Sequence, residues 1–164
     1  GRSDLAPVKL SMLAMTNPDD IQGGLAEAMQ GADVFVGLAV AGALTPQMVS
    51  SMAKDAIVFA MANPIPEIMP DLASAAGAAV VGTGRSDFPN QINNSLVFPG
   101  VFRGALDIKA TRITTGMKLA AAKALAALIT EPTTERVIPW SLDPTVSPAV
   151  AQATASAWTA ENTG

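Results

Sequence analysis

Cysteine, histidine and tyrosine are all absent from this sequence of 164 residues. Without cysteine there is no disulfide, no thiolate nucleophile and no cysteine-ligated zinc, and this composition is compatible with the cytoplasm, where we expect the protein. Without histidine and tyrosine, proton transfer would have to rely on Asp, Glu or Lys. The composition therefore argues against a self-contained Ser-His-Asp hydrolase and against a histidine-based metal site.

Long apolar runs and clusters of basic residues are also missing. Hydrophobic residues make up 49% of the chain, but no uninterrupted run approaches the roughly 18 residues that a membrane-spanning helix needs. The chain opens on the polar residues Gly1–Asp4, with none of the apolar character of a signal peptide. The net charge is −4, and no group of Lys and Arg is available to bind phosphates. We therefore expect neither a membrane nor a nucleic acid as a partner.

Three short apolar segments recur about 20 residues apart in the first half of the chain, which is the rhythm of alternating strands and helices. They are Val34–Leu38, Ile57–Ala62 and Ala79–Gly82. None of them alternates apolar with polar residues, and this pattern is typical of strands buried on both faces of a parallel sheet. The segments therefore predict three parallel strands covered by helices.

Helical signals separate these strands. A Thr-Pro pair at residues 45–46 predicts a helix start, with threonine as N-cap and proline in the first turn. A Pro-Asp pair at residues 70–71 predicts a second start, of a short helix that stops at Gly77. Two further helices are expected before the first strand, over residues 4–14 and 21–30.

The second half of the chain carries helical patterns only. Residues 94–107 have apolar side chains at helical spacing, and the Pro99-Gly100 pair should kink this helix or mark its first turn. Thr114 or Thr115 opens the next helix, and a proline-rich connection leads to a last helix near Ala149–Trp158. The buried stripe of the helix that starts at Thr114 or Thr115 is expected to comprise Met117, Ala120, Ala121, Ala124, Leu125 and Leu128.

These patterns predict an α/β fold, namely the second half of a Rossmann-like doubly wound parallel sheet with about three strands, followed by C-terminal helices. Sheets of the dinucleotide-binding type usually have about six strands. No G-x-G-x-x-G turn and no P-loop occurs in the sequence. We therefore expect the first half of the fold, with its phosphate-binding turn, to lie outside this chain.

Small residues and an asparagine follow the first two predicted strands, at the edge where open parallel sheets bind ligands. The first strand ends in Gly37–Gly42, where small residues would let the backbone approach a ligand closely. The alternative there is an ordinary tight turn. The second strand ends at Asn63-Pro64, where the Asn63 amide could bind a ligand or only close an Asx turn.

An amide-rich segment follows the third strand. It contains Asn90, Gln91, Asn93 and Asn94 directly before an apolar helix. Asn93 or Asn94 could be the N-cap of that helix, but four amides are more than a cap requires. A group of neutral amides suits a carboxylate or a carboxamide ligand, since it adds no titrating charge. Because all three strand ends should meet at one edge, we interpret that edge as a binding site.

Three segments of the sequence form a combination typical of one family. They are Gly31–Leu38 (GADVFVGL), Phe59–Pro64 (FAMANP) and Gly82–Asn94 (GTGRSDFPNQINN). Together they resemble the nicotinamide-binding domain of bacterial malic enzymes, and the similarity continues through Phe98–Asp107 to about Thr159. The resemblance implies oxidative decarboxylation of malate to pyruvate and CO2, with NAD or NADP taking the hydride and Mg2+ or Mn2+ polarising the substrate.

The resemblance also implies roles for individual residues. Asn63 and Asn94 would bind the substrate, while Asn63 and Asn93 would contact the cofactor. Gly37, Leu38 and Ala39 would lie along the cofactor. The family's catalytic Tyr and Lys, its acidic metal ligands and its Gly-rich turn precede the segment that this chain matches. We therefore expect no activity without the missing N-terminal half or a companion chain, and we expect a homo-oligomer.

On this basis we assign residues 1–130 to a partial NAD(P)-binding Rossmann-like domain, and residues 131–164 to a proline-rich connection and a C-terminal helix of the same domain. Two alternatives stay open. The chain could be a non-catalytic scaffold or oligomerisation module, built on the Ala, Leu and Met faces of its C-terminal helices. It could also belong to a different NAD(P)-dependent dehydrogenase, although the Asn-rich segment argues against this.

Overall fold

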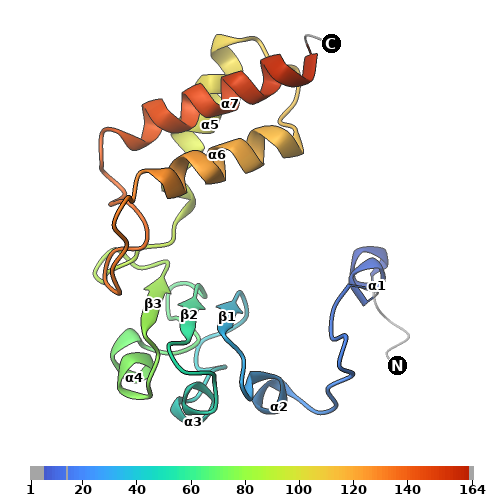
Figure 1. Ribbon diagram of the computed structural model, residues 1–164, viewed down its shortest axis with the longest axis vertical. Coiled ribbons are helices and arrows are strands. Elements are labelled where there is room, and N and C mark those ends of the chain that lie inside the picture. The colour runs from blue at the N-terminus through green and yellow to red at the C-terminus, as the bar shows by residue number, and fades with distance from the viewer. Residues whose placement is uncertain (1–5, 14, 163–164) are drawn as a thin grey trace.

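The computed structural model describes residues 6–13 and 15–162 (Figure 1). The first part of the described chain alternates helices with strands, and the second part is helical. In chain order, the elements are α1 (Pro7–Leu13), α2 (Leu25–Met29), β1 (Val34–Gly37), α3 (Pro46–Ser50), β2 (Ile57–Ala60), α4 (Pro70–Ala75), β3 (Val80–Thr83), the 3-10 turn η1 (Asn94–Leu96), α5 (Phe98–Asp107), α6 (Thr115–Ala127) and α7 (Val146–Asn162).

The three strands form one parallel sheet in the order β1-β2-β3. Gly37, Ala60 and Thr83 occupy the same register position at the carboxyl ends of the strands. The prediction of an α/β fold with three parallel strands followed by helices is therefore confirmed. The parallel register brings the three carboxyl ends to one edge of the sheet, and in Figure 1 the strand arrows point toward the helical part.

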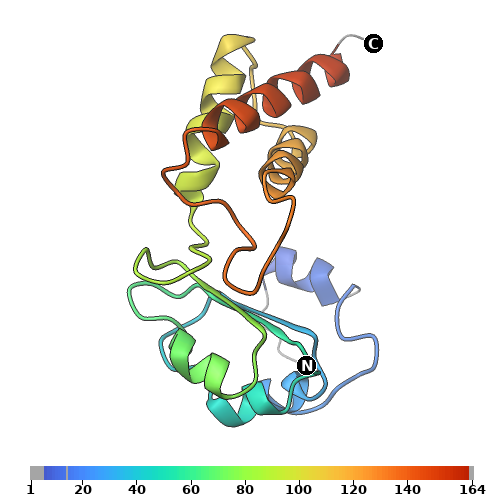
Figure 2. The same cartoon turned by 60° about the vertical axis from the view of Figure 1, so that its left-hand side comes forward.

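Helices α2, α3 and α4 cover one face of the sheet (Figures 1 and 2). Met29, Val49 and Ala73, one from each helix, pack into a common core with Val58 and Ala60 of β2. All five side chains are at most 3% exposed. This core holds the three strands in place because burial of apolar surface is the main stabilising contribution to such a layer.

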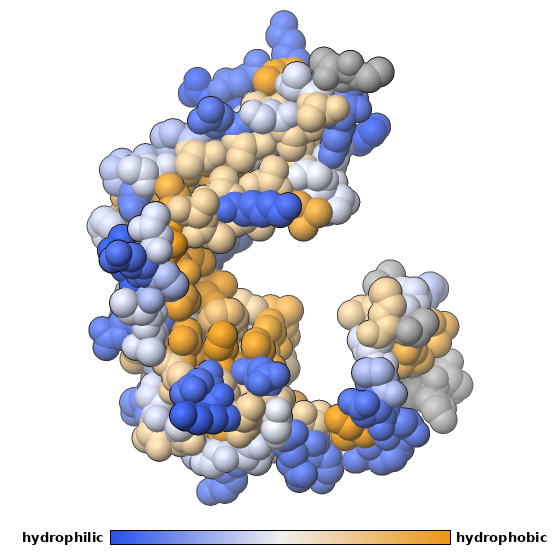
Figure 3. All heavy atoms as spheres, viewed as in Figure 1, coloured by the Kyte–Doolittle hydropathy of each residue, from blue (hydrophilic) through white to orange (hydrophobic). Residues whose placement is uncertain are grey.

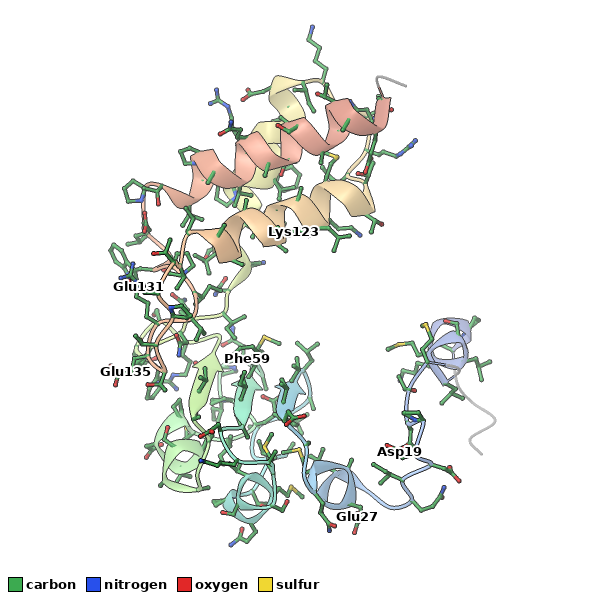
Figure 4. All side chains as sticks on the ribbon, in the orientation of Figure 1. Asp19, Glu27, Phe59, Lys123, Glu131 and Glu135 are labelled. Atoms are coloured by element: carbon green, nitrogen blue, oxygen red, sulfur yellow. The ribbon has the colours of Figure 1, made fainter. Side chains whose placement is uncertain are left out.

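The opposite face of the sheet is open in the described chain. Val34 and Val36 of β1 are 49% and 56% exposed, and they share this face with Ile57 and Phe59 of β2. Figure 3 shows hydrophobic residues gathered on this open face of the sheet, and Figure 4 places Phe59 there. The expectation that the strands are buried on both faces is wrong for this face, because α2, α3 and α4 all lie on the other one.

Two of the predicted helix starts follow from local sequence signals. The Thr45 hydroxyl accepts the backbone N–H of Met48 at 3.3 Å and so caps α3, with Pro46 in the first turn. Helix α4 begins at Pro70, and Gly77 follows its end with a φ of +108°, a conformation that favours glycine. Both predictions are confirmed.

The helix predicted over residues 21–30 is wrong in its first half, because only Leu25–Met29 is helical. Gly23 has a φ of +122°, which is incompatible with a helix. The Glu27 carboxylate accepts the Gly24 N–H at 2.7 Å and caps this later start, and the bond lowers the pKa of Glu27. Of the helix predicted over residues 4–14, α1 covers Pro7–Leu13; residues 4, 5 and 14, and the polar segment at residues 1–4, lie outside the described residues.

Helices α5, α6 and α7 form a second packed unit. The six residues predicted for the inner stripe of α6 are all buried or half-buried, and Met117 is 0% exposed. Pro99 lies in the first turn of α5, as one of the two predicted alternatives had it. Helix α7 starts earlier than expected, at Val146, and ends at Asn162. Among the described residues, no helix has the length and apolar character needed to cross a membrane.

Two glycines allow α5 and α7 to approach each other closely. A Cβ atom on Gly100 would lie 2.6 Å from the Cβ of Val150, and one on Gly104 would collide with the backbone carbonyl of Ala151. Since both conflicts involve atoms of a buried helix interface, a larger residue would force the helices apart.

Gly104→Ala should lower the free energy of unfolding by about 1–3 kcal/mol, because overpacking of a filled interface displaces backbone or side chains. Urea denaturation followed by circular dichroism measures the change. The matched control is Gly84→Ala, whose Cβ would lie 3.8 Å from its nearest neighbouring atom and whose effect should stay within about 0.5 kcal/mol. Equal denaturation midpoints for the two variants would contradict the close helix contact.

Candidate functional site

The side chain of Glu67 joins the carboxyl ends of β1 and β2. One carboxylate oxygen accepts the N–H of Ala39 at 2.8 Å, and the other accepts the N–H of Ala62 at 3.0 Å. Glu67 is 0% exposed. The turn after β1 and the turn after β2 are therefore held together by one buried carboxylate, which is absent from the site residues predicted from the sequence.

The turn Gly37–Ala39 is shaped by this carboxylate. A Cβ on Gly37 would lie 2.5 Å from the carboxyl carbon of Glu67, so that only glycine fits at the end of β1. Gly37 itself is buried, whereas Leu38 is 79% exposed and Ala39 is also exposed. The packing of Glu67 therefore requires glycine at position 37. Leu38 and Ala39, which follow it, face the solvent.

Asn63 follows directly on Ala62, at the carboxyl end of β2. Asn63 is exposed, and the Asn63-Pro64 peptide bond is cis. The side-chain amide of Asn63 therefore stands at the sheet edge next to a backbone group that Glu67 fixes.

The amide-rich segment after β3 does not act as one cluster, because Asn90 points inward. Asn90 is 6% exposed, and its side-chain NH2 donates to the carbonyls of Val81 at 3.1 Å and Thr134 at 2.8 Å. Its side-chain oxygen accepts the N–H of Val137 at 2.9 Å. Asn90 thus ties β3 to the connection between α6 and α7, and its φ of +54° is one that asparagine tolerates better than most residues.

Asn93 and Asn94 differ in what they contact. The side-chain oxygen of Asn93 accepts the N–H of Ser95 at 3.0 Å, so Asn93 is the N-cap of η1 and is half-buried. Asn94 is exposed. Of the two candidates for the cap, the structure assigns Asn93 and leaves the Asn94 side chain facing the solvent.

The loop between β3 and η1 also carries an ion pair. The Arg85 guanidinium donates to both carboxylate oxygens of Asp87, at 2.9 Å and 2.6 Å, and lies 5.3 Å from the centre of the Phe88 ring. This bidentate hydrogen bond lowers the pKa of Asp87 and raises the pKa of Arg85. Both charges are therefore engaged with each other.

The segments after the strands converge at one edge. A Cβ built on Gly84 would lie 3.8 Å from the carbonyl oxygen of Ile92 and 3.9 Å from that of Met61, so the segment leading to Asn93 runs beside the one leading to Asn63. The Ile92 N–H also donates to the Thr83 carbonyl at 2.7 Å. The predicted convergence of the strand ends is thus present in the structure.

The chemistry of this edge suits binding. Exposed amides can donate to and accept from a carboxylate or a carboxamide, while both oxygens of Glu67 are already hydrogen-bonded. Among residues 6–13 and 15–162, no three His, Cys, Asp or Glu side chains gather into a possible metal site. A hollow of about 590 Å³, lined in part by Pro46 and Leu72, lies between α3 and α4, away from this edge.

Comparison with known proteins gives consistent matches. Residues 14–157 match the family model described as malic enzyme, NAD binding domain. The chain is 58% identical over 152 residues to the bifunctional malic/malolactic enzyme of Bacillus subtilis, covering 92% of the chain, and 50% identical over 139 residues to the NADP-dependent malic enzyme of Halomonas elongata, covering 84%. A crystal structure of the NAD-dependent malic enzyme of Thermotoga maritima superposes with a TM-score of 0.87 at 42% identity, covering 92% of the chain.

These relatives are much longer than the chain. The match spans 37% of the Bacillus protein, 32% of the Halomonas protein and 40% of the Thermotoga protein. The shared segment is therefore a minor part of each relative.

Asn90→Ala should lower the free energy of unfolding by about 2–3 kcal/mol, because it removes the three hydrogen bonds that this buried side chain makes to the backbone of Val81, Thr134 and Val137. The exposed Asn94 provides the matched control, and Asn94→Ala should change the free energy by no more than about 0.5 kcal/mol. Thermal and urea denaturation of both variants measure the difference. If both substitutions destabilise the chain equally, the assignment of Asn90 as the internal tie is wrong.

Proposed function

The chain belongs to the malic enzyme family, matching its NAD-binding domain, and on this premise we propose that the strand-end edge holds malate and the nicotinamide end of NAD or NADP. The reaction is the oxidative decarboxylation of malate to pyruvate and CO2. The observation that carries the proposal is the exposure of Asn63 and Asn94 on segments that the fold brings together, beside the turn Gly37–Ala39.

In the proposed complex, the chain orients its ligands through neutral groups. Asn63 and Asn94 hydrogen-bond a carboxylate of malate, and the free NH2 of the capping residue Asn93 and the amide of Asn63 face the nicotinamide carboxamide. The exposed residues Leu38 and Ala39 lie along the cofactor. When bound, NAD or NADP accepts the hydride from malate. Neutral amides keep malate oriented without adding charge beside the reacting carbon.

Proton transfer and metal binding are assigned to other parts of the enzyme. The described residues offer no set of ligands that fits Mg2+ or Mn2+, and the sequence contains no tyrosine. The greater length of the relatives supports the proposal that a preceding N-terminal half supplies these groups.

The open side of the sheet supports the same proposal. Within the described residues, β1 pairs only with β2, so its other edge has no partner strand. Val34 and Val36 on the open face are about half exposed, although a doubly wound sheet is normally covered on both faces. The first half of the domain would supply a strand that pairs with the free edge of β1, and it would also cover the open face of the sheet. A cytoplasmic location and a homo-oligomeric state stay predictions.

Asn94→Ala in the complete enzyme should lower kcat/KM for malate about 100-fold or more, since a misplaced substrate loses orientation, while the melting temperature stays nearly unchanged. Steady-state assays with malate, Mn2+ and NAD or NADP measure the rate. Asn162→Ala serves as the control, because Asn162 is an exposed asparagine at the far end of α7 and its loss should leave kcat/KM unaltered.

Two outcomes would contradict the proposal. A wild-type enzyme that fails to reduce either cofactor with malate rules out the reaction. An Asn94→Ala enzyme with an unchanged rate shows that this amide does not bind the substrate.

A further inference from the structure

Glu67 is a buried carboxylate that the proposed function leaves without a role. It is 0% exposed, and among the described residues neither ion pair involves it. Its carboxylate is satisfied by two backbone N–H groups, from Ala39 and Ala62. Burying a carboxylate is costly unless it is well hydrogen-bonded. A buried glutamate at this position therefore indicates that its two hydrogen bonds have a role besides packing.

The backbone around Glu67 is hydrogen-bonded as well. The Glu67 carbonyl accepts the N–H of Leu44 at 3.1 Å, and the carbonyl of Pro66 accepts the N–H of Gly42 at 3.4 Å. Its neighbours Pro66 and Ile68 are buried. The carboxylate therefore extends from a fixed segment and reaches two strand ends at once.

Each amide that Glu67 binds adjoins a predicted ligand contact. Ala39 ends the turn that follows β1, and Ala62 directly precedes Asn63. We propose that Glu67 is a positioning residue that keeps the cofactor-side turn and Asn63 in register with each other. This inference rests on the proposed function. Loss of either hydrogen bond would let the two turns move independently and would weaken the binding of both ligands.

Glu67→Gln tests the inference in the complete enzyme. Glutamine keeps the size of the side chain, but its NH2 cannot accept a backbone N–H, so one of the two hydrogen bonds is lost. Glu67→Asp keeps the charge but is one methylene too short to bridge both amides. The matched control is Glu27→Gln, because Glu27 also accepts a backbone N–H through its carboxylate but lies on α2, away from the strand ends (Figure 4).

Glu67→Gln should raise the KM for malate and the KM for the dinucleotide by about tenfold or more, with a smaller fall in kcat at saturation. Glu67→Asp should also raise both KM values, because it cannot bridge both amides, and Glu27→Gln should leave both KM values unchanged. Hydrogen exchange should also show faster exchange at the amides of Ala39 and Ala62 in Glu67→Gln. A loss of stability alone would move the melting temperature and leave the KM values in place.

The outcomes separate the two proposals. A wild-type enzyme without activity on malate overturns the proposed function and, with it, the role of Glu67. An active wild-type enzyme whose Glu67→Gln variant has the KM values of the control overturns the positioning role alone. If both Glu67 variants fail to fold, Glu67 is a residue of the fold and the positioning role is also overturned.

Discussion

The parallel register of three short strands is the constraint on which the rest of the structure depends. It places Gly37, Ala60 and Thr83 side by side, so that the turns after all three strands begin at the same edge. Two buried polar side chains then fix the segments beyond the strands. Glu67 holds the turns after β1 and β2 together, and Asn90 ties the segment after β3 to the connection before α7. Because Ala62 directly precedes Asn63, the Glu67 carboxylate also fixes the backbone beside this exposed amide.

One face of the sheet and the helical part of the chain are tightly packed, whereas the other face of the sheet is open. α2, α3 and α4 bury one face of the sheet, and the glycines of α5 bring α7 close in the helical part. The other face of the sheet, with Val34 and Val36, stays open. This asymmetry agrees with the family match, because the relatives extend far beyond the segment they share with this chain.

Features encoded by neighbouring residues could be predicted from the sequence. The strands, the Thr45 cap, the start of α4 and its end before Gly77 all follow from signals within a few positions. The roles of Glu67 and Asn90 could not, because their partners lie up to 28 and 47 residues away along the chain. The helix predicted over residues 21–30 was wrong because Gly23 and the Glu27 side chain set a later start. The open face was missed because the continuous apolar pattern of the strands predicts burial on both faces, whereas Val34 and Val36 on one face are about half exposed in the described chain.

The most direct test of the account is a crystal structure of the complete enzyme with NAD or NADP and an unreactive analogue of malate. The account predicts that the Asn94 amide hydrogen-bonds a carboxylate of the analogue, with Asn63 and the turn Gly37–Ala39 beside the nicotinamide ring. Glu67 should still hold Ala39 and Ala62 in that complex. Ligands bound away from this edge, for example in the hollow between α3 and α4, would contradict it.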